Sequence, residues 1–399
     1  MNNSFTDPEF MSDPFKGADQ LRDQAAFVQV KLPVIGKVWV TTTQAALGIV
    51  LKDTETFSLR KHDGRVTGVQ WWMPKAITLL ANNMLTMDDP DHARLRGLVD
   101  KAFRRDFIMG LEPRIQTIAD NMATRLFDER DTADLVHGFA RKFPLAVICE
   151  LLGIREKDRA VFANWAESLT GIDGMISFLR AVGPIRKMRL FVSKEIERQR
   201  SAPENGLIGQ LVEMQSEGAE ISDDELIAMI FLLLIAGHET TTHVISGGVL
   251  ELLRSRQQKE WLLGDASHIP LAVEEILRFV SAVQFAKPRN VRSDVEIEGV
   301  KLKKGDVVMA MIVAANGDPS VIHNPHEFDL SRKPNRHVSF GAGPHFCLGH
   351  QLARLEIACA LKALFSKHPN LGLAVDESKV KWKSRIGIRI VEALPVKSS

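Results

Sequence analysis

The amino-acid sequence predicts a mainly α-helical protein with small β-sheets, folded as one domain. Apolar residues recur at helical spacing through most of residues 90–200. The proline-free stretch 221–253 is apolar on most faces in its first half, so we expect a long helix through the centre of the domain. Because no segment rich in proline, glycine or serine marks a boundary, we expect a single domain over residues 16–399. A flexible segment should precede it over residues 1–15, where a second methionine, Met11, is compatible with a vector-derived extension.

The composition indicates a soluble cytoplasmic protein. Of its 399 residues, 45% are hydrophobic and 25% are charged, which is enough to bury a large core. The net charge of +1 gives no reason to expect binding to nucleic acid or to an anionic membrane. The N-terminus lacks the pattern of a signal peptide, and the most apolar stretch, 226–237, is shorter than the roughly 20 residues that cross a bilayer. Three cysteines, an odd number, argue against a disulfide framework and favour a reducing compartment.

Local patterns predict further elements. Apolar and polar residues alternate around a central glycine over residues 27–42, which indicates a hairpin. Ser222 and Glu225 have the spacing of a capping box and mark the start of the long helix. Residues 295–316 contain short strand patterns separated by glycine turns.

The stretch FGAGPHFCLG, residues 340–349, places Cys347 among glycines directly before a helical pattern. Backbone N–H groups at a helix N-terminus lower the pKa of a cysteine, which favours the thiolate that binds metals. Glycines allow the backbone to bend around the sulfur and to approach a flat ligand closely. The absence of a CxxC pattern favours a single open thiolate ligand over a zinc site. An ordinary buried cysteine beside a turn is the alternative.

The order of Phe340, Gly343, Cys347 and Gly349, with Arg354 following, resembles the cysteine loop of the cytochrome P-450 superfamily, the haem-thiolate monooxygenases. All positions of the pattern FxxGxxxCxG followed by xxLAR match. The resemblance implies a cytochrome P-450 fold, with the long central helix over haem b and the cysteine loop beneath it. It also implies that Cys347 is the axial ligand of the haem iron and that Phe340 and Gly349 contact the cofactor.

The long central helix carries AGHETT at residues 236–241. The resemblance assigns Glu239 and Thr240 to proton delivery, with Ala236 small enough to let oxygen and haem approach. A threonine inside a helix can bond back to the carbonyl one turn earlier, and an acid can supply protons. The alternative is a Glu-Thr pair on a buried helix without a catalytic role.

Further motifs match the family at lower specificity. Glu275 and Arg278 lie one helical turn apart, and the resemblance makes them a buried structural pair that supports the cysteine loop. On sequence alone such a pair is an ordinary surface feature. The resemblance also assigns four residues to the haem propionates: His92, Arg96, Arg289 and His345.

Electrons are expected to come from separate proteins, because no flavin domain or cysteine cluster of a ferredoxin is visible. We expect a ferredoxin or flavodoxin and its reductase, which draw on NAD(P)H. Basic residues from segments near the cysteine form the expected docking face, although ordinary solvated charges are an equal alternative. These residues are Lys101, Arg104, Arg105, Arg336 and Arg354.

The resemblance locates the substrate pocket above the haem, and apolar residues dominate the corresponding segments. Gln284 and Lys287 add groups that could orient a polar or acidic part of a ligand. Core packing is the alternative for every position. The apolar candidates are Trp71, Trp72, Met73, Leu79, Leu232, Ile235, Phe285 and Ala286.

The sequence therefore predicts a monomeric monooxygenase that inserts one oxygen atom from O2 into a hydrophobic small molecule by hydroxylation or epoxidation. A terpenoid, polyketide, fatty acyl or aromatic natural product would fit. Two alternatives remain open: a peroxide-driven peroxygenase of the same fold, and a haem sensor or carrier without catalysis.

Overall fold

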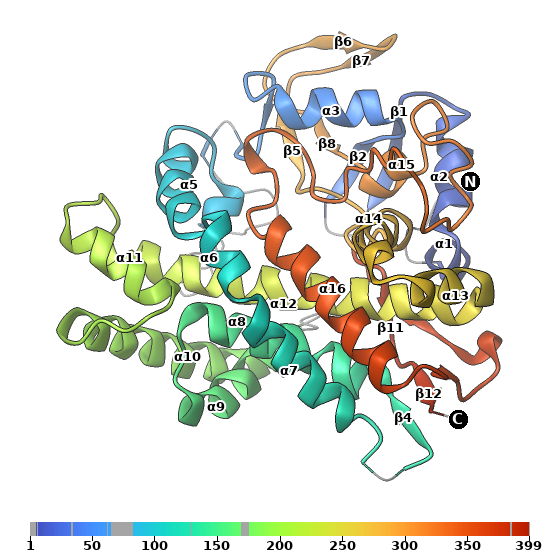
Figure 1. Ribbon diagram of the computed structural model, residues 1–399. Helices are drawn as coiled ribbons and strands as arrows, with labels where there is room; N and C mark the ends of the chain where they lie inside the picture. Colours follow the sequence, from blue (N-terminus) through green and yellow to red (C-terminus); the bar gives the residue numbers. More distant parts are fainter. Residues whose placement is uncertain are drawn as a thin grey trace.

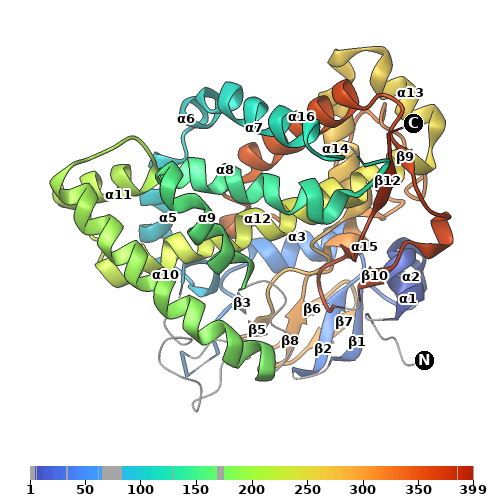
Figure 2. The same ribbon diagram turned by 90° about the horizontal axis from the view of Figure 1, so that it is seen from below.

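The computed structural model describes residue 5 and residues 7–32, 35–61, 63–64, 83–128, 130–168, 175–383 and 385–398. A large helical part surrounds the long helix α12 (Asp223–Arg254), and a smaller part contains a five-stranded sheet (Figure 1). The view from below shows α8 and α12 running through the helical part, with α10 at its outer side (Figure 2). The prediction of a mainly α-helical protein with small β-sheets is confirmed.

Helices make up most of the described chain. The α-helices besides α12 are α1 (Pro8–Ser12), α2 (Pro14–Arg22), α3 (Gln44–Lys52), α5 (Asp91–Ala102), α6 (Arg105–Gly110), α7 (Glu112–Thr124), α8 (Lys142–Leu152), α9 (Glu156–Glu167), α10 (Met175–Ser201), α11 (Leu207–Ser216), α13 (Arg256–Gly264), α14 (Ile269–Val280), α15 (Ile312–Asn316) and α16 (His350–Lys367). Short helical turns are η1 (Met84–Thr86), the π-helical η2 (Val136–Ala140), η3 (Ala266–His268), η4 (Gly343–His345) and η5 (Glu377–Lys379).

The largest sheet has the strand order β1-β2-β8-β5-β3, in which only β2 and β8 run parallel. Its hairpin pairs β1 with β2 around the predicted turn, and the predicted strand patterns of residues 295–316 become β6, β7 and β8, except that residues 312–316 form the helix α15. The strands are β1 (Phe27–Leu32), β2 (Gly36–Thr41), β3 (Phe57–Ser58), β4 (Thr132–Asp134), β5 (Arg289–Val291), β6 (Val295–Ile297), β7 (Val300–Leu302), β8 (Val307–Met309), β9 (Gly372–Leu373), β10 (Trp382–Lys383), β11 (Ile390–Val391) and β12 (Pro395–Lys397).

Helix α12 organises the helical part. The predicted capping box is present, because the Ser222 hydroxyl accepts from the Glu225 amide and the Glu225 carboxylate accepts from the Ser222 amide. The helix packs against α8, α14 and α16. Within the described chain it alone is long and apolar enough to cross a membrane, but 67% of its apolar window is buried inside the protein. A core helix explains these properties.

The N-terminal residues depart from the expected flexible segment. Met11 is completely buried, and Phe15 is nearly so in the core beside the sheet. The Arg389 side chain donates hydrogen bonds to the carbonyls of Met11 and Ser12, at 2.9 and 2.8 Å. Packing against the C-terminal part therefore holds this segment in place, so the expectation of flexibility through residue 15 does not hold for residues 7–15.

Glu356 of α16 lies completely inside the core, where α16 meets α12. One interaction of its side chain is a hydrogen bond with Thr241, and its Oε2 has no partner among the described residues. Burial raises the pKa of Glu356 well above 4.5, and the hydrogen bond with Thr241 opposes this shift only in part. Burial therefore favours the neutral form of this carboxyl in the folded protein.

Replacing this carboxyl with a neutral amide should stabilise the protein above pH 4.5. In wild type the unfolded chain releases the Glu356 proton near pH 4.5 while the folded chain retains it, so stability falls as pH rises. The loss is about 1.4 kcal/mol per pH unit until the folded pKa is reached. Urea unfolding of Glu356→Gln between pH 5 and pH 8 should lack this slope. An unchanged slope, equal to that of the exposed control Glu213→Gln, would contradict the assignment.

Candidate active site

The cysteine loop bends sharply between the sheet and α16. Gly341 and Gly343 have φ values of +73° and +71°, which favour glycine. A Cβ on Gly343 would lie 2.3 Å from the Leu51 carbonyl oxygen at the end of α3, so a side chain would clash with the backbone there. The Cys347 amide donates to the Phe340 carbonyl at 2.9 Å. The loop is therefore closed on itself and pressed against α3.

The thiol of Cys347 is half-buried and takes part in no disulfide. Burial raises its pKa, although the Gly349 amide and the charges of Arg96 and Arg354 act in the opposite direction. The expectation that the helix start favours the thiolate is thus correct in direction, but burial has the larger effect on this pKa. A thiolate at this position is stabilised when a cation binds to its sulfur.

A buried ion pair holds the chain that leads into this loop. Glu275 and Arg278 of α14 are completely buried and bonded through two contacts, at 2.7 and 2.8 Å. Arg278 also donates to three carbonyls of residues 316–327. Glu275 accepts from the Asp329 amide, Arg332 and Asn335. The expected structural role of the pair agrees with this network, and a surface pair is excluded.

The neighbouring Glu274 clamps the other side of the loop. Its carboxylate binds Arg354 of α16, at 2.6 and 2.9 Å, and His337, at 2.8 Å. Burial opposes ionisation, but the hydrogen bonds from His337 and Arg354 lower the pKa of Glu274 to about 2. The guanidinium of Arg354 lies 4.5 Å from the ring centroid of Phe340. Arg354 is therefore committed to the loop, which corrects its expected place in a docking face.

The four residues expected at the propionates meet from distant segments. The rings of His92 (α5) and His345 (η4) lie 3.9 Å apart. Arg96 donates to the Phe346 carbonyl at 2.8 Å. Arg289 is buried and donates to the Phe57 carbonyl at 3.2 Å, but its Nε has no partner among the described residues.

Within this group the charge of Arg289 favours an anionic ligand, whereas His345 is neutral. Burial, followed by the positive charges of His92 and Arg289, lowers the pKa of His345 to about 3. Burial also lowers the pKa of Arg289, although Asp88 opposes the shift. A buried guanidinium with an orphan N–H calls for an acceptor. The residues present thus fit the carboxylates that a haem would bring.

The middle of α12 shows an unfilled face. Ala236 is exposed and Leu232, Ile235 and Gly237 are only partly buried, although most of the helix is buried. The Thr240 hydroxyl donates to the Ala236 carbonyl at 2.8 Å, as expected for a threonine inside a helix. Ala236 therefore borders a solvent-accessible hollow on this face of α12.

Glu239 has a partner that sequence reasoning missed. Its carboxylate forms an ion pair with Arg385, which follows β10. The turn that contains Arg385 is fixed by a bond from the Gln284 amide to the Gly387 carbonyl, at 2.9 Å. No local pattern marks Arg385, because its partner lies 146 positions earlier.

The expected substrate-pocket residues divide into several groups. Leu232 and Ile235 lie on the unfilled face of α12, whereas Gln284 is completely buried and its side-chain amide has no partner in the described part of the chain. Phe285 is buried too, and its ring packs edge-to-face on Phe5 with centroids 5.0 Å apart. The core packing of Phe285 therefore corrects its expected place on the pocket wall. Trp71, Trp72, Met73 and Leu79 lie outside the described residues.

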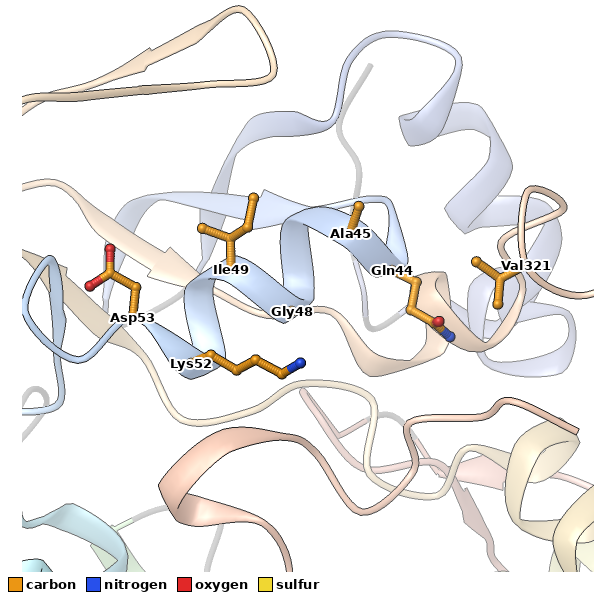
Figure 3. A pocket seen from close by; sticks show the side chains of 7 residues that line it. All are labelled: Gln44, Ala45, Gly48, Ile49, Lys52, Asp53 and Val321. Carbon is orange, nitrogen blue, oxygen red and sulfur yellow. The ribbon is translucent and has the colours of Figure 1, made fainter.

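A separate hollow of about 630 Å³ opens beside α3 (Figure 3). Its wall includes Gly48, Ile49, Lys52 and Val321. None of the motif residues lines it, and it is open to the surface. Among the described residues, no group of three or more His, Cys, Asp or Glu side chains could hold a metal ion.

Comparisons with known proteins agree with this geometry. The family model described as Cytochrome P450 matches residues 177–369. Polyketide biosynthesis cytochrome P450 PksS of Bacillus subtilis strain 168 is 33% identical over 396 residues, which are 98% of this chain and 97% of the relative. Vitamin D(3) 25-hydroxylase of Pseudonocardia autotrophica is 37% identical over 392 residues, 97% of this chain and 94% of the relative.

Solved structures give the same result. The PksS structure superposes with a TM-score of 0.90 at 33% identity and covers 99% of both chains. Myxobacterial cytochrome P450 CYP267B1 in complex with myristic acid also gives a TM-score of 0.90 at 33% identity, covering 99% of this chain and 98% of that chain. The chain belongs to the cytochrome P450 family and is a P450 monooxygenase.

Proposed function

We propose that this monooxygenase binds haem b through Cys347 and hydroxylates or epoxidises a hydrophobic small molecule such as a terpenoid, polyketide, fatty acyl or aromatic natural product. The observation that carries the proposal is the half-buried, disulfide-free thiol of Cys347 on a loop clamped by Glu274 and Glu275. When bound, haem supplies the activation of O2 and the insertion of one oxygen atom into the substrate. The chain supplies the axial ligand, the anion-binding groups and the protons.

The roles of the remaining site residues follow from their positions. We assign the propionates to the group that contains the cationic Arg289 and the neutral His345, supported by the Nε of Arg289, which has no partner among the described residues. His92 and Arg96 complete this group, and Phe340, Gly349 and Ala236 border the cofactor. Leu232 and Ile235 bind apolar parts of the substrate. We further propose a cytoplasmic monomer with one domain from residue 16 onward.

Protons would reach the hollow through Glu239 and Thr240. Glu239 is only 12% exposed and is held by Arg385, so its carboxylate has a defined position. The Thr240 hydroxyl is held by the Ala236 carbonyl, which directs its oxygen lone pairs away from the helix axis. The pair supports an O2-dependent reaction over a peroxide-driven one, because peroxide already contains the two protons that O2 lacks.

Cys347→Ser should remove the spectroscopic signature of a thiolate ligand. We expect the reduced wild-type protein with carbon monoxide to show the red-shifted Soret band of thiolate-ligated haem. The serine variant should lose this band, whereas Cys359→Ala, which changes a buried core thiol of α16, should keep it. A folded wild-type protein without the band would refute the proposal. The band without substrate-dependent O2 consumption would instead favour a haem sensor or carrier.

Thr240→Ala should separate electron consumption from product formation. Without its hydroxyl, proton delivery to the hollow is impaired, and we expect the yield of product per electron to fall about tenfold or more, with hydrogen peroxide released instead. Thr242→Ala is a matched control, because Thr242 makes the same back-bond, to the His238 carbonyl at 2.8 Å, on the buried face. Equal coupling in wild type and Thr240→Ala would remove Thr240 from the proton route.

Electrons would enter over the cysteine side from an acidic ferredoxin or flavodoxin reduced by NAD(P)H through its reductase. Bacterial P450 enzymes generally use ferredoxin-type partners. Around the loop, Lys101, Arg104, Arg105 and Arg336 are exposed and form no ion pair with the described residues. Phe346, at 36% exposure, adds an apolar contact beside the cysteine. This combination of cations and one aromatic side chain suits an acidic partner.

Charge reversal at Arg104→Glu and Arg105→Glu should slow reduction by the partner at least about tenfold at low salt, with a smaller effect at high salt. Stopped-flow reduction kinetics measure this effect. The matched control is Lys187→Glu with Lys194→Glu on α10, which both views place away from α16 (Figures 1 and 2). Equal rates for the two double variants would refute docking at this face.

A further inference from the structure

The C-terminal turn, residues 385–389 between β10 and β11, carries two arginines with different partners. Arg385 forms an ion pair with Glu239 of α12, the only ion pair of this glutamate within the described chain. The side chains of Arg385 and Glu239 are 28% and 12% exposed. Arg389 is buried, and its guanidinium donates to three backbone carbonyls. The turn therefore joins α12 to a second part of the fold.

The second part is the N-terminal segment. The Nε of Arg389 donates to the Met11 carbonyl at 2.9 Å, and its Nη2 donates to the Ser12 carbonyl at 2.8 Å. Helix α1, which contains both residues, packs against β10 (Figure 2), and the Met11 side chain is completely buried. The Arg389 guanidinium also lies 4.1 Å from the ring centroid of Trp382 on β10. These contacts attach α1 to the C-terminal turn.

The backbone of the C-terminal turn is held from its other side by the segment after α14. The Arg389 amide donates to the Ala282 carbonyl at 2.8 Å, and the Gln284 amide donates to the Gly387 carbonyl at 2.9 Å. Gly387 has a φ of +83°, a conformation that favours glycine. Residues 387–389 therefore follow one defined path, and Arg385 reaches Glu239 from an anchored backbone.

Folding stability alone does not account for the ion pair of Arg385 and Glu239. Partly exposed ion pairs contribute little to stability, because water screens them and two long side chains lose freedom. A carboxylate that passes protons has a stricter requirement, since proton transfer needs hydrogen-bond reach and a displacement of about 1 Å can slow a reaction about 100-fold. A glutamate without a partner is free to rotate about its side-chain bonds. The main effect of Arg385 is therefore to restrict the position of this carboxylate.

We infer that the N-terminal segment positions the proton-delivery acid: α1 holds Arg389, Arg389 fixes the C-terminal turn, and the turn directs Arg385 onto Glu239. Arg385 and Arg389 are thus positioning residues and not catalytic residues. The inference rests on the proposed function, because it takes Glu239 as the residue that delivers protons.

The first test changes the ion pair in the haem-loaded full chain. The probe substrate is whichever of tetradecanoic acid, limonene and naphthalene wild type oxidises with the highest yield. For Arg385→Gln we expect the yield of product per electron to fall about fivefold or more, with an unchanged unfolding temperature and carbon monoxide band. Arg385→Lys should restore most of the yield, because an ammonium can still pair with Glu239. Lys383→Gln, an exposed residue of β10, is the matched control and should change the yield less than about twofold.

The second test changes the far end of the connection. Met11→Ala removes a buried side chain of α1, so hydrogen–deuterium exchange at residues 385–391 should accelerate about tenfold or more, whatever the substrate. The product yield should fall as well, but no further in the double variant with Arg385→Gln, because both changes act through one contact. Leu262→Ala, which shortens a buried side chain of α13, is the matched control. It should lower the unfolding temperature and leave both the exchange and the yield unchanged.

Three results would overturn the inference. A wild-type yield in Arg385→Gln would show that the ion pair has no part in proton delivery. Wild-type exchange of residues 385–391 in Met11→Ala would show that α1 does not hold the C-terminal turn. A yield loss in Met11→Ala that adds fully to that of Arg385→Gln would show that α1 acts on the fold in general. In each case uncoupling by Thr240→Ala would leave the proposed function standing, whereas a wild-type protein without the carbon monoxide band would refute both.

Discussion

The position of the cysteine loop depends on the buried ion pair of Glu275 and Arg278. Removing two charges from water is costly, and their mutual attraction alone does not reliably offset that cost. Here each side chain also forms further hydrogen bonds: Arg278 donates to three carbonyls, and Glu275 accepts from one amide and two further side chains. Because all of these partners lie within residues 316–335, the pair defines the path of the chain directly before the loop. Glu274 then fixes the loop itself through Arg354.

The second constraint is a helix that stays incompletely covered. Most of α12 is buried, as its sequence predicts, but the fold leaves the turn around Ala236 exposed. Thr240, Thr241 and Thr242 each bond back to a carbonyl one turn earlier, so their hydroxyls are satisfied within the helix. Helix stability therefore does not depend on filling the hollow. That independence allows a cofactor and a changing substrate to occupy it.

Local patterns predicted the elements whose partners lie nearby in the chain. The hairpin of β1 and β2, the capping box at Ser222 and the helix after Cys347 follow from spacing alone, and the structure confirms them. Contacts between distant segments were beyond such patterns. Phe285 was expected on the pocket wall because it is apolar, but the side it faces is decided by Phe5.

The same limit explains why the sequence predicted neither the order of the N-terminus nor the ion pair of Glu239. The first residues have too few apolar positions to predict order. Met11 is nevertheless completely buried, and the Arg389 side chain donates a hydrogen bond to its carbonyl oxygen. Glu239 was identified through its motif, whereas Arg385 carries no motif and becomes visible only when the C-terminal turn packs beside residue 284.

One buried cation, Arg289, has no carboxylate partner among the described residues. Burial lowers its pKa, and its Nε has no hydrogen-bond partner among those residues. Two haem carboxylates would compensate the group around Arg289. Arg385, by contrast, is already paired with Glu239 of α12, so its charge needs no counter-ion from a ligand.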